Sequence, residues 1–202
     1  MYSSPRMVPG LTTIIVAVSL GGCVRDTKPA AFYLLGPTAT PATERIEGPR
    51  IIVGPVEFPR YLDRPQIVTR HSEGRIEIDE FARWAEPLNH TVPAVIAENL
   101  SALTGGTRIV PFLQIREMIS DYRIVAMVSR FDTDEAGNTV LDVKWSVLRS
   151  TDKSYTMARH SIYRSNTSAS DYEQRVASMN ALLLRWSEDI ATEIQRMDSA
   201  SP

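Results

Sequence analysis

Apolar residues recur with a helical period near the end of the chain, and they predict a long amphipathic helix there. Seven of them, three or four positions apart, fall on one face: Tyr172, Val176, Met179, Leu183, Trp186, Ile190 and Ile194. Ser170 and Glu173 have the spacing of a capping box, so we expect the helix to begin beside them. Such a stripe is typical of a helix that packs on a sheet, and a partner-binding face is the second interpretation.

A shorter helix is predicted near the middle of the chain, over residues 92–103, where apolar side chains again share one face. Asn89 or Thr91 would cap its start, and Pro93 is tolerated in a first turn. The glycine pair at 105–106 supplies its end.

Shorter apolar runs bounded by glycine, proline and polar residues predict strands. They cover residues 32–35, 50–58, 66–70, 75–79, 107–110, 123–131, 139–149 and 154–164. Gly54-Pro55 marks a bulge, residues 72–74 form a hairpin turn, and residues 81–88 serve as a connecting segment. These elements predict a mixed α/β fold: a largely antiparallel or mixed sheet with two main helices packed on it, in a single domain.

The first residues have the form of a secretion signal. An apolar run of about ten residues, 11–20, is too short for the ~20 that a membrane-spanning helix needs. It ends in Leu20, Gly21, Gly22 and Cys23, which resemble the bacterial lipobox. In that motif the Cys23 thiol accepts a diacylglycerol, and its new amino terminus takes an N-acyl chain, which together anchor a protein to a membrane. The alternative is an ordinary signal peptide with an incidental cysteine.

The lipobox sets the expected boundaries. Residues 1–22 form the signal peptide, 23–31 an acylated tether, 32–197 a single domain and 198–202 a polar tail. Val24 stands where an aspartate would signal retention in the inner membrane, which favours the outer membrane. Removing 22 of the 202 residues leaves 180, a size that folds as one domain with a sizeable core.

Composition and motifs argue against catalysis, metal binding and nucleic-acid binding. The net charge of −2 lacks a basic excess, no familiar catalytic motif is present, and one cysteine forms no internal disulfide. His71, His90 and His160 are scattered. Residues 132–135 suggest a calcium loop, but a solvated hairpin turn is favoured because the EF-hand spacing is missing. We therefore expect neither an enzyme nor any cofactor beyond the acyl groups on Cys23.

Two blocks between elements, residues 59–68 and 83–88, combine proline, arginine and aromatic residues. The first is interpreted either as a rigid turn with a surface pair of Asp63 and Arg60 or Arg64, or as a presented docking loop. The second is interpreted either as an exposed interface pair of Arg83 and Trp84 or as a segment with Trp84 buried in the core. The docking hypothesis assigns partner binding to Tyr61, Leu62, Asp63, Arg64, Pro65, Gln66, Arg83 and Trp84.

These blocks also carry a family resemblance. Tyr33-Leu34-Leu35-Gly36, Val53-Gly54-Pro55-Val56, the run from Tyr61 to Val68, the run from Arg83 to Leu88 and Glu98-Asn99-Leu100 resemble the ABC-type transport auxiliary lipoproteins, the PqiC-like family. The resemblance implies a mixed α/β lipoprotein on the periplasmic face of a Gram-negative outer membrane. It implies an accessory role in phospholipid transport and membrane integrity, docked to a mammalian-cell-entry (MCE) domain protein of the PqiB type. Self-association of copies stays open, as does a lipid carrier with its own acyl-chain cavity.

Overall fold

A long central strand organises the sheet of this protein. The computed structural model describes residues 28–71, 74–112, 119–150, 158–165, 169 and 171–199, so Leu20, Gly21, Gly22 and Cys23 lie outside the described residues. Its strands are β1 Ala31–Tyr33, β2 Ile51–Glu57, β3 Gln66–Arg70, β4 Ile76–Trp84, β5 Ile109–Pro111, β6 Tyr122–Asp134, β7 Thr139–Arg149 and β8 Arg159–Ser165. Its helices are α1 Leu88–Thr104 and α2 Tyr172–Ser199.

Strand β6 pairs along one edge with β7, which in turn pairs with β8, both antiparallel. Its other edge is shared: β2 runs parallel to its first half, and β3 runs parallel to its last residues. The sheet therefore divides into a β2–β5 wing and a β3–β4–β1 wing. The predicted hairpin of residues 66–79 and the bulge at Gly54-Pro55 are both confirmed.

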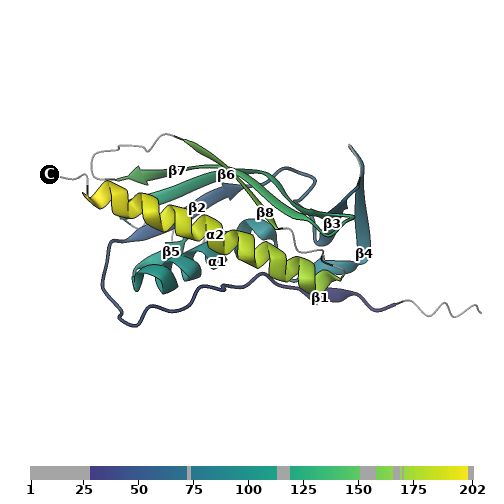
Figure 1. Ribbon diagram of the computed structural model, residues 1–202, viewed down its shortest axis with the longest axis horizontal. Coiled ribbons are helices and arrows are strands. Elements are labelled where there is room, and N and C mark those ends of the chain that lie inside the picture. The colour runs from purple at the N-terminus through teal and green to yellow at the C-terminus, as the bar shows by residue number, and fades with distance from the viewer. Residues whose placement is uncertain are drawn as a thin grey trace, which may run out of the picture.

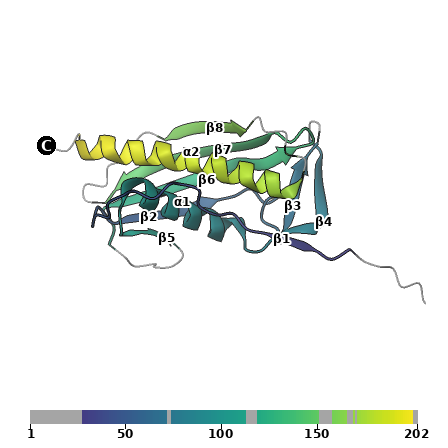
Figure 2. The same cartoon turned by 60° about the horizontal axis from the view of Figure 1, so that its bottom comes forward.

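Both helices cover one face of this mixed eight-stranded sheet (Figures 1 and 2). Helix α1 packs on β2 and β5, α2 packs on β7 and β8, and the two helices contact each other. The predicted apolar stripe of α2 faces the core, where Leu183, Trp186 and Ile190 are each 0% exposed. The predicted fold class, a mixed sheet with two packed helices, is confirmed.

The helix starts differ from the sequence prediction. The Asp171 carboxylate accepts the backbone N–H of Gln174 at 2.8 Å, so α2 is capped one residue later than the predicted box of Ser170 and Glu173. Helix α1 begins at Leu88, where no side chain caps it. Neither Asn89 nor Thr91 is therefore its cap. Its predicted end at Gly105 is confirmed, because that glycine has a left-handed φ of 72°.

Residues 81–88 are not simply a connecting segment. Strand β4 continues to Trp84, because β1 pairs with its end and places Phe32 opposite Arg83. The local pattern of this stretch does not alternate clearly, so the pairing partner rather than the residue period makes it a strand. Of the last predicted strand, residues 154–157 lie outside the described residues, and the rest corresponds to β8 from Arg159 onward.

Candidate functional site

The two polar blocks meet at one end of the sheet and form a cleft of about 240 Å³. The backbone N–H of Trp84 donates to the carbonyl of Pro65 at 2.6 Å, and Gln66 pairs with Arg83 across β3 and β4. These bonds bring together segments nearly twenty residues apart. The cleft is lined by Phe58, Leu62, Asp63, Arg64, Pro65, Trp84, Ala85, Glu86, Pro87, Leu88 and Asn89.

The loop that forms one wall, residues 59–65, is a tight turn closed by its own backbone. The N–H of Leu62 donates to the carbonyl of Pro59 at 2.9 Å, and the N–H of Asp63 donates to that of Arg60 at 3.2 Å. Leu62 points inward and is 4% exposed, whereas Asp63 is exposed. The turn therefore inserts an apolar side chain into the core and presents a charged one at the surface.

A hydrogen bond from Tyr61 to a buried carboxylate holds this loop against the sheet. Its hydroxyl donates to Asp132 Oδ2 at 3.1 Å, and the Asp132 side chain is fully buried. Arg70 binds the same carboxylate at 2.8 Å, and Arg130 binds it at 2.7 Å. Burial, followed by the negative charge of Asp132, raises the pKa of Tyr61 to about 12. The loop is thus held in one position by hydrogen bonds to a charged group, which are stronger than neutral ones.

This position of Asp132 corrects the sequence interpretation. The sequence predicts a solvated turn for residues 132–135, but Asp132 lies within β6 and is 1% exposed. Asp134 closes the turn, where its carboxylate accepts the N–H of Asn138 at 2.8 Å, and Glu135 is exposed within that turn as predicted. No local pattern marks Asp132 as buried, because Arg130 is a local partner but Tyr61 and Arg70 lie 71 and 62 residues away in the sequence.

The cleft combines an apolar floor with charged groups at its rim. Trp84 is 6% exposed and belongs to the core, which settles its two interpretations in favour of the buried one. Asp63, Arg64 and Glu86 also line the cleft. Among the described residues, the buried Nε of Arg64 finds no hydrogen-bond partner. A buried donor without a partner is unusual, and here it adjoins the cleft.

Five of the eight predicted docking residues line the cleft: Leu62, Asp63, Arg64, Pro65 and Trp84. Tyr61 lies beneath the loop, as described above. Gln66 and Arg83 lie outside the cleft and both bind Glu80, each at 3.0 Å. Hydrogen bonds from Gln66 and then Arg83 hold the pKa of Glu80 below its usual value. The sequence missed Phe58 and Asn89, since neither block contains them.

The histidines do not form a metal centre in the described part of the chain. His71 joins Glu77 and Glu135 beside the β3–β4 hairpin, and His160 contacts Asp142 at 2.8 Å. No group of three or more histidine, cysteine or acidic side chains with metal-binding geometry occurs among the described residues. His90 is exposed on α1.

Solved structures share this fold. A crystal structure titled as an uncharacterized protein is 21% identical, with a TM-score of 0.67, and the match covers 83% of this chain and 99% of the other. The crystal structure of protein XCC0632 from Xanthomonas campestris, assigned to the DUF330 family, is 20% identical with a TM-score of 0.67. That match covers 85% of this chain and all of the other, 100%. At these identities the similarity establishes the fold.

The class of protein is thus a two-helix, mixed-sheet domain found in other chains of similar length. The chain belongs to the family of ABC-type transport auxiliary lipoprotein components, whose model matches residues 33–191. Membership identifies a transport accessory rather than a known kind of enzyme and indicates a location in the cell envelope. No curated protein matches the chain. Neither described helix is both long and apolar enough to cross a membrane.

Proposed function

We propose that this protein is a non-catalytic accessory subunit of an envelope phospholipid transport system, acylated on Cys23 and held on the periplasmic face of the outer membrane. Its cleft docks an MCE-domain protein that bridges the two membranes. Family membership over residues 33–191 supports the transport role. The observation that carries the docking role is the cleft itself, where five of the predicted docking residues converge from the two family blocks.

The cleft is suited to docking because its wall is ordered before a partner arrives. Leu62 is buried in the core, and Tyr61 is bound to Asp132. Ordering a loop on binding costs free energy, so a wall that is already fixed binds more tightly for the same contacts. The cleft's small volume favours a side chain or a turn of a protein partner.

The charges at the rim indicate what such a partner presents. Arg64 lines the rim, and its guanidinium favours an acceptor such as a backbone carbonyl or a carboxylate. Asp63 and Glu86 favour a basic or amide group nearby. An apolar side chain flanked by these groups would fill the floor against Trp84 and Leu62.

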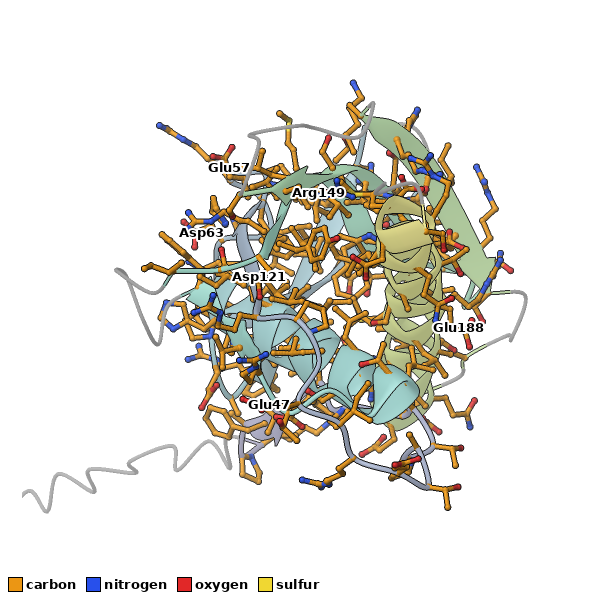
Figure 3. All side chains as sticks on the ribbon, turned by 90° about the vertical axis from the view of Figure 1, so that its left-hand side faces the viewer. Glu47, Glu57, Asp63, Asp121, Arg149 and Glu188 are labelled. Carbon is orange, nitrogen blue, oxygen red and sulfur yellow. The ribbon has the colours of Figure 1, made fainter. Side chains whose placement is uncertain are left out.

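Charge reversal at the rim tests this docking role. We expect the mature lipoprotein to co-purify with its MCE-domain protein, and the double variant Asp63→Arg with Arg64→Glu to lose most of that partner. Glu188→Arg on α2 is the matched control, because Glu188 and Asp63 lie at opposite margins of the molecule in Figure 3. Equal recovery of partner by all three proteins would reject the cleft as the docking site.

The anchor has a separate test. Cys23→Ala removes the thiol that accepts the lipid, so we expect loss of acylation and a shift out of the membrane fraction. A variant that still carries lipid and stays in the outer-membrane fraction would contradict the proposed anchor. Acylation with recovery from the inner membrane would contradict the outer-membrane assignment alone.

A lipid carrier is the less favoured function. A carrier must enclose an acyl chain, whereas four pockets in the described part of the chain hold about 240, 260, 310 and 360 Å³ and open to the surface. Mass spectrometry of the purified protein, after its covalent lipid is accounted for, distinguishes the two. Stoichiometric non-covalent phospholipid would favour the carrier.

A further inference from the structure

An apolar patch lies on the outer face of β1, where the described chain begins. Phe32 is 66% exposed, Leu34 is 55% exposed, and Phe81 of β4 is 38% exposed. We call these three residues the β1 patch. Large apolar side chains that gather on a surface mark an interaction site more often than scattered ones do.

Strand geometry shows that the three side chains share one face. Phe32 pairs directly with Arg83, so both side chains lie on the same side of the sheet. Leu34 and Phe81 are each two residues from one member of that pair, and side chains two apart point the same way. Neighbouring residues in the chain face the core, including Leu35 at 3% and Ala82 at 2% exposure.

The patch is also accessible from the side. Strand β1 pairs only with β4 within the described residues, so its other edge is open. In Figure 1, β1 lies at the opposite end of the molecule from the C-terminal end of α2. The cleft adjoins this end, because Trp84 opposite Tyr33 is one of its lining residues.

The position of the acylation site says what covers this patch. Cys23 precedes Ala31 by eight residues, and eight fully extended residues span at most about 28 Å. Membrane attachment at Cys23 therefore keeps β1 within that distance of the bilayer. Of the basic residues near the patch, Arg83 beside Phe32 is paired with Glu80, and Lys28 is exposed in this short stretch. Phospholipid headgroups with a negative charge attract such residues.

We propose that the β1 patch rests on the lipid surface of the leaflet that holds the Cys23 acyl chains. This inference depends on the proposed acylation. Aromatic rings are favoured at the boundary between headgroups and acyl chains, and buried apolar area adds to lipid anchoring. The contact orients the domain, so that the cleft opens beside the membrane rather than in a random direction.

A single-probe experiment tests the contact. Because acylation consumes the one native thiol, Leu34→Cys introduces the sole free cysteine of the mature lipoprotein. Met127→Cys on the outer face of β6 is the matched control, since Met127 is 54% exposed against 55% for Leu34. Each variant carries an environment-sensitive fluorophore and is reconstituted into phosphatidylethanolamine–phosphatidylglycerol vesicles that contain a nitroxide-labelled phospholipid.

We expect the nitroxide lipid to quench the probe at position 34 strongly and the probe at position 127 weakly. Adding Phe32→Ser and Phe81→Ser to the Leu34→Cys variant reduces this quenching toward the control. Equal quenching at both positions, or none at position 34 in protein that floats with the vesicles, overturns the patch contact and leaves the anchor intact.

Two other outcomes also test whether the β1 patch contacts the lipid surface. Protein that does not float with vesicles overturns the acyl anchor and the patch contact with it. A probe at position 34 that is shielded from aqueous iodide but not quenched by the nitroxide lipid shows that protein covers the patch, which overturns the lipid surface as its occupant.

Discussion

Helix α2 and the loop of residues 59–65 are both fixed to the sheet, but by different forces. The helix buries a long apolar stripe in which Trp186 and Ile190 are fully buried. The loop buries one leucine and depends on a hydrogen bond from Tyr61 to Asp132. Apolar packing has no fixed direction, whereas hydrogen bonds to a buried carboxylate require one geometry.

This difference matches what each region does. Helix α2 is held on the sheet by many apolar contacts together, so it stabilises the whole domain. The carboxylate of Asp132 positions the cleft wall. The loop therefore has a well-defined position, but that position depends on one residue. A stable scaffold with a separately positioned loop is a common arrangement for a binding surface.

The largest loss of stability is expected from a substitution in α2. Trp186→Ala opens a cavity beneath α2 and is expected to lower the free energy of unfolding by about 3–5 kcal/mol. Urea denaturation followed by circular dichroism measures it. Glu188→Ala, two residues away on the exposed face, is the control and should change stability little. A loss below about 1 kcal/mol for Trp186→Ala would contradict the importance of the stripe.

The next effect is expected at Asp132. Asp132→Asn removes the charge shared by Arg70 and Arg130 and should cost about 1.5–3 kcal/mol. Glu193 of α2 is the matched comparison, because it is also a buried acid with two arginine partners, Arg159 and Arg196.

The arginines at Asp132 are 27% and 28% exposed, whereas those at Glu193 are 48% and 61% exposed. Solvent screens the second group more strongly, so Glu193→Gln should cost less in the same urea experiment. The reverse order would show that burial of the arginines does not control the strength of these pairs. Only Asp132→Asn is also expected to weaken recovery of the docking partner.

A smaller effect is expected at Tyr61. Tyr61→Phe keeps the ring but removes the hydroxyl that donates to Asp132, so stability should fall by about 1 kcal/mol at neutral pH. Partner recovery should fall more than this stability loss explains, because the loop loses its fixed position. Unchanged recovery would indicate that the backbone turn alone positions the loop.

A last effect appears only at high pH. Tyrosine ionises near pH 10 when unfolded, and the pKa of Tyr61 is raised to about 12 in the folded protein. The folded state therefore retains a proton that the unfolded state releases, so stability falls as pH rises from about 10 to 12. Tyr172, whose pKa is also raised to about 12, adds to this fall. Urea midpoints measured across this range should decline less steeply for Tyr61→Phe, and an unchanged slope would count against the buried hydroxyl.

Local patterns predicted the elements well where one face of an element is buried. The α2 stripe has a helical period because that helix lies on the sheet, and β7 alternates because one face of it packs under the helices. The prediction failed at residues 81–84, which became strand through pairing with β1. It failed again at Asp132, whose charge suggested a turn although its arginine partners allow it to be buried.

By itself, the sequence determined which segments form helices and strands, because hydrophobic periodicity is a local property. It also singled out the two blocks of the cleft and the Cys23 motif that predicts an anchor. Only the tertiary structure decided that Leu62 to Pro65 and Trp84 share one cleft, while Tyr61 lies beneath it and Arg83 faces outward. Strand pairing and a buried carboxylate join residues far apart in the chain, and such contacts leave no period in the sequence.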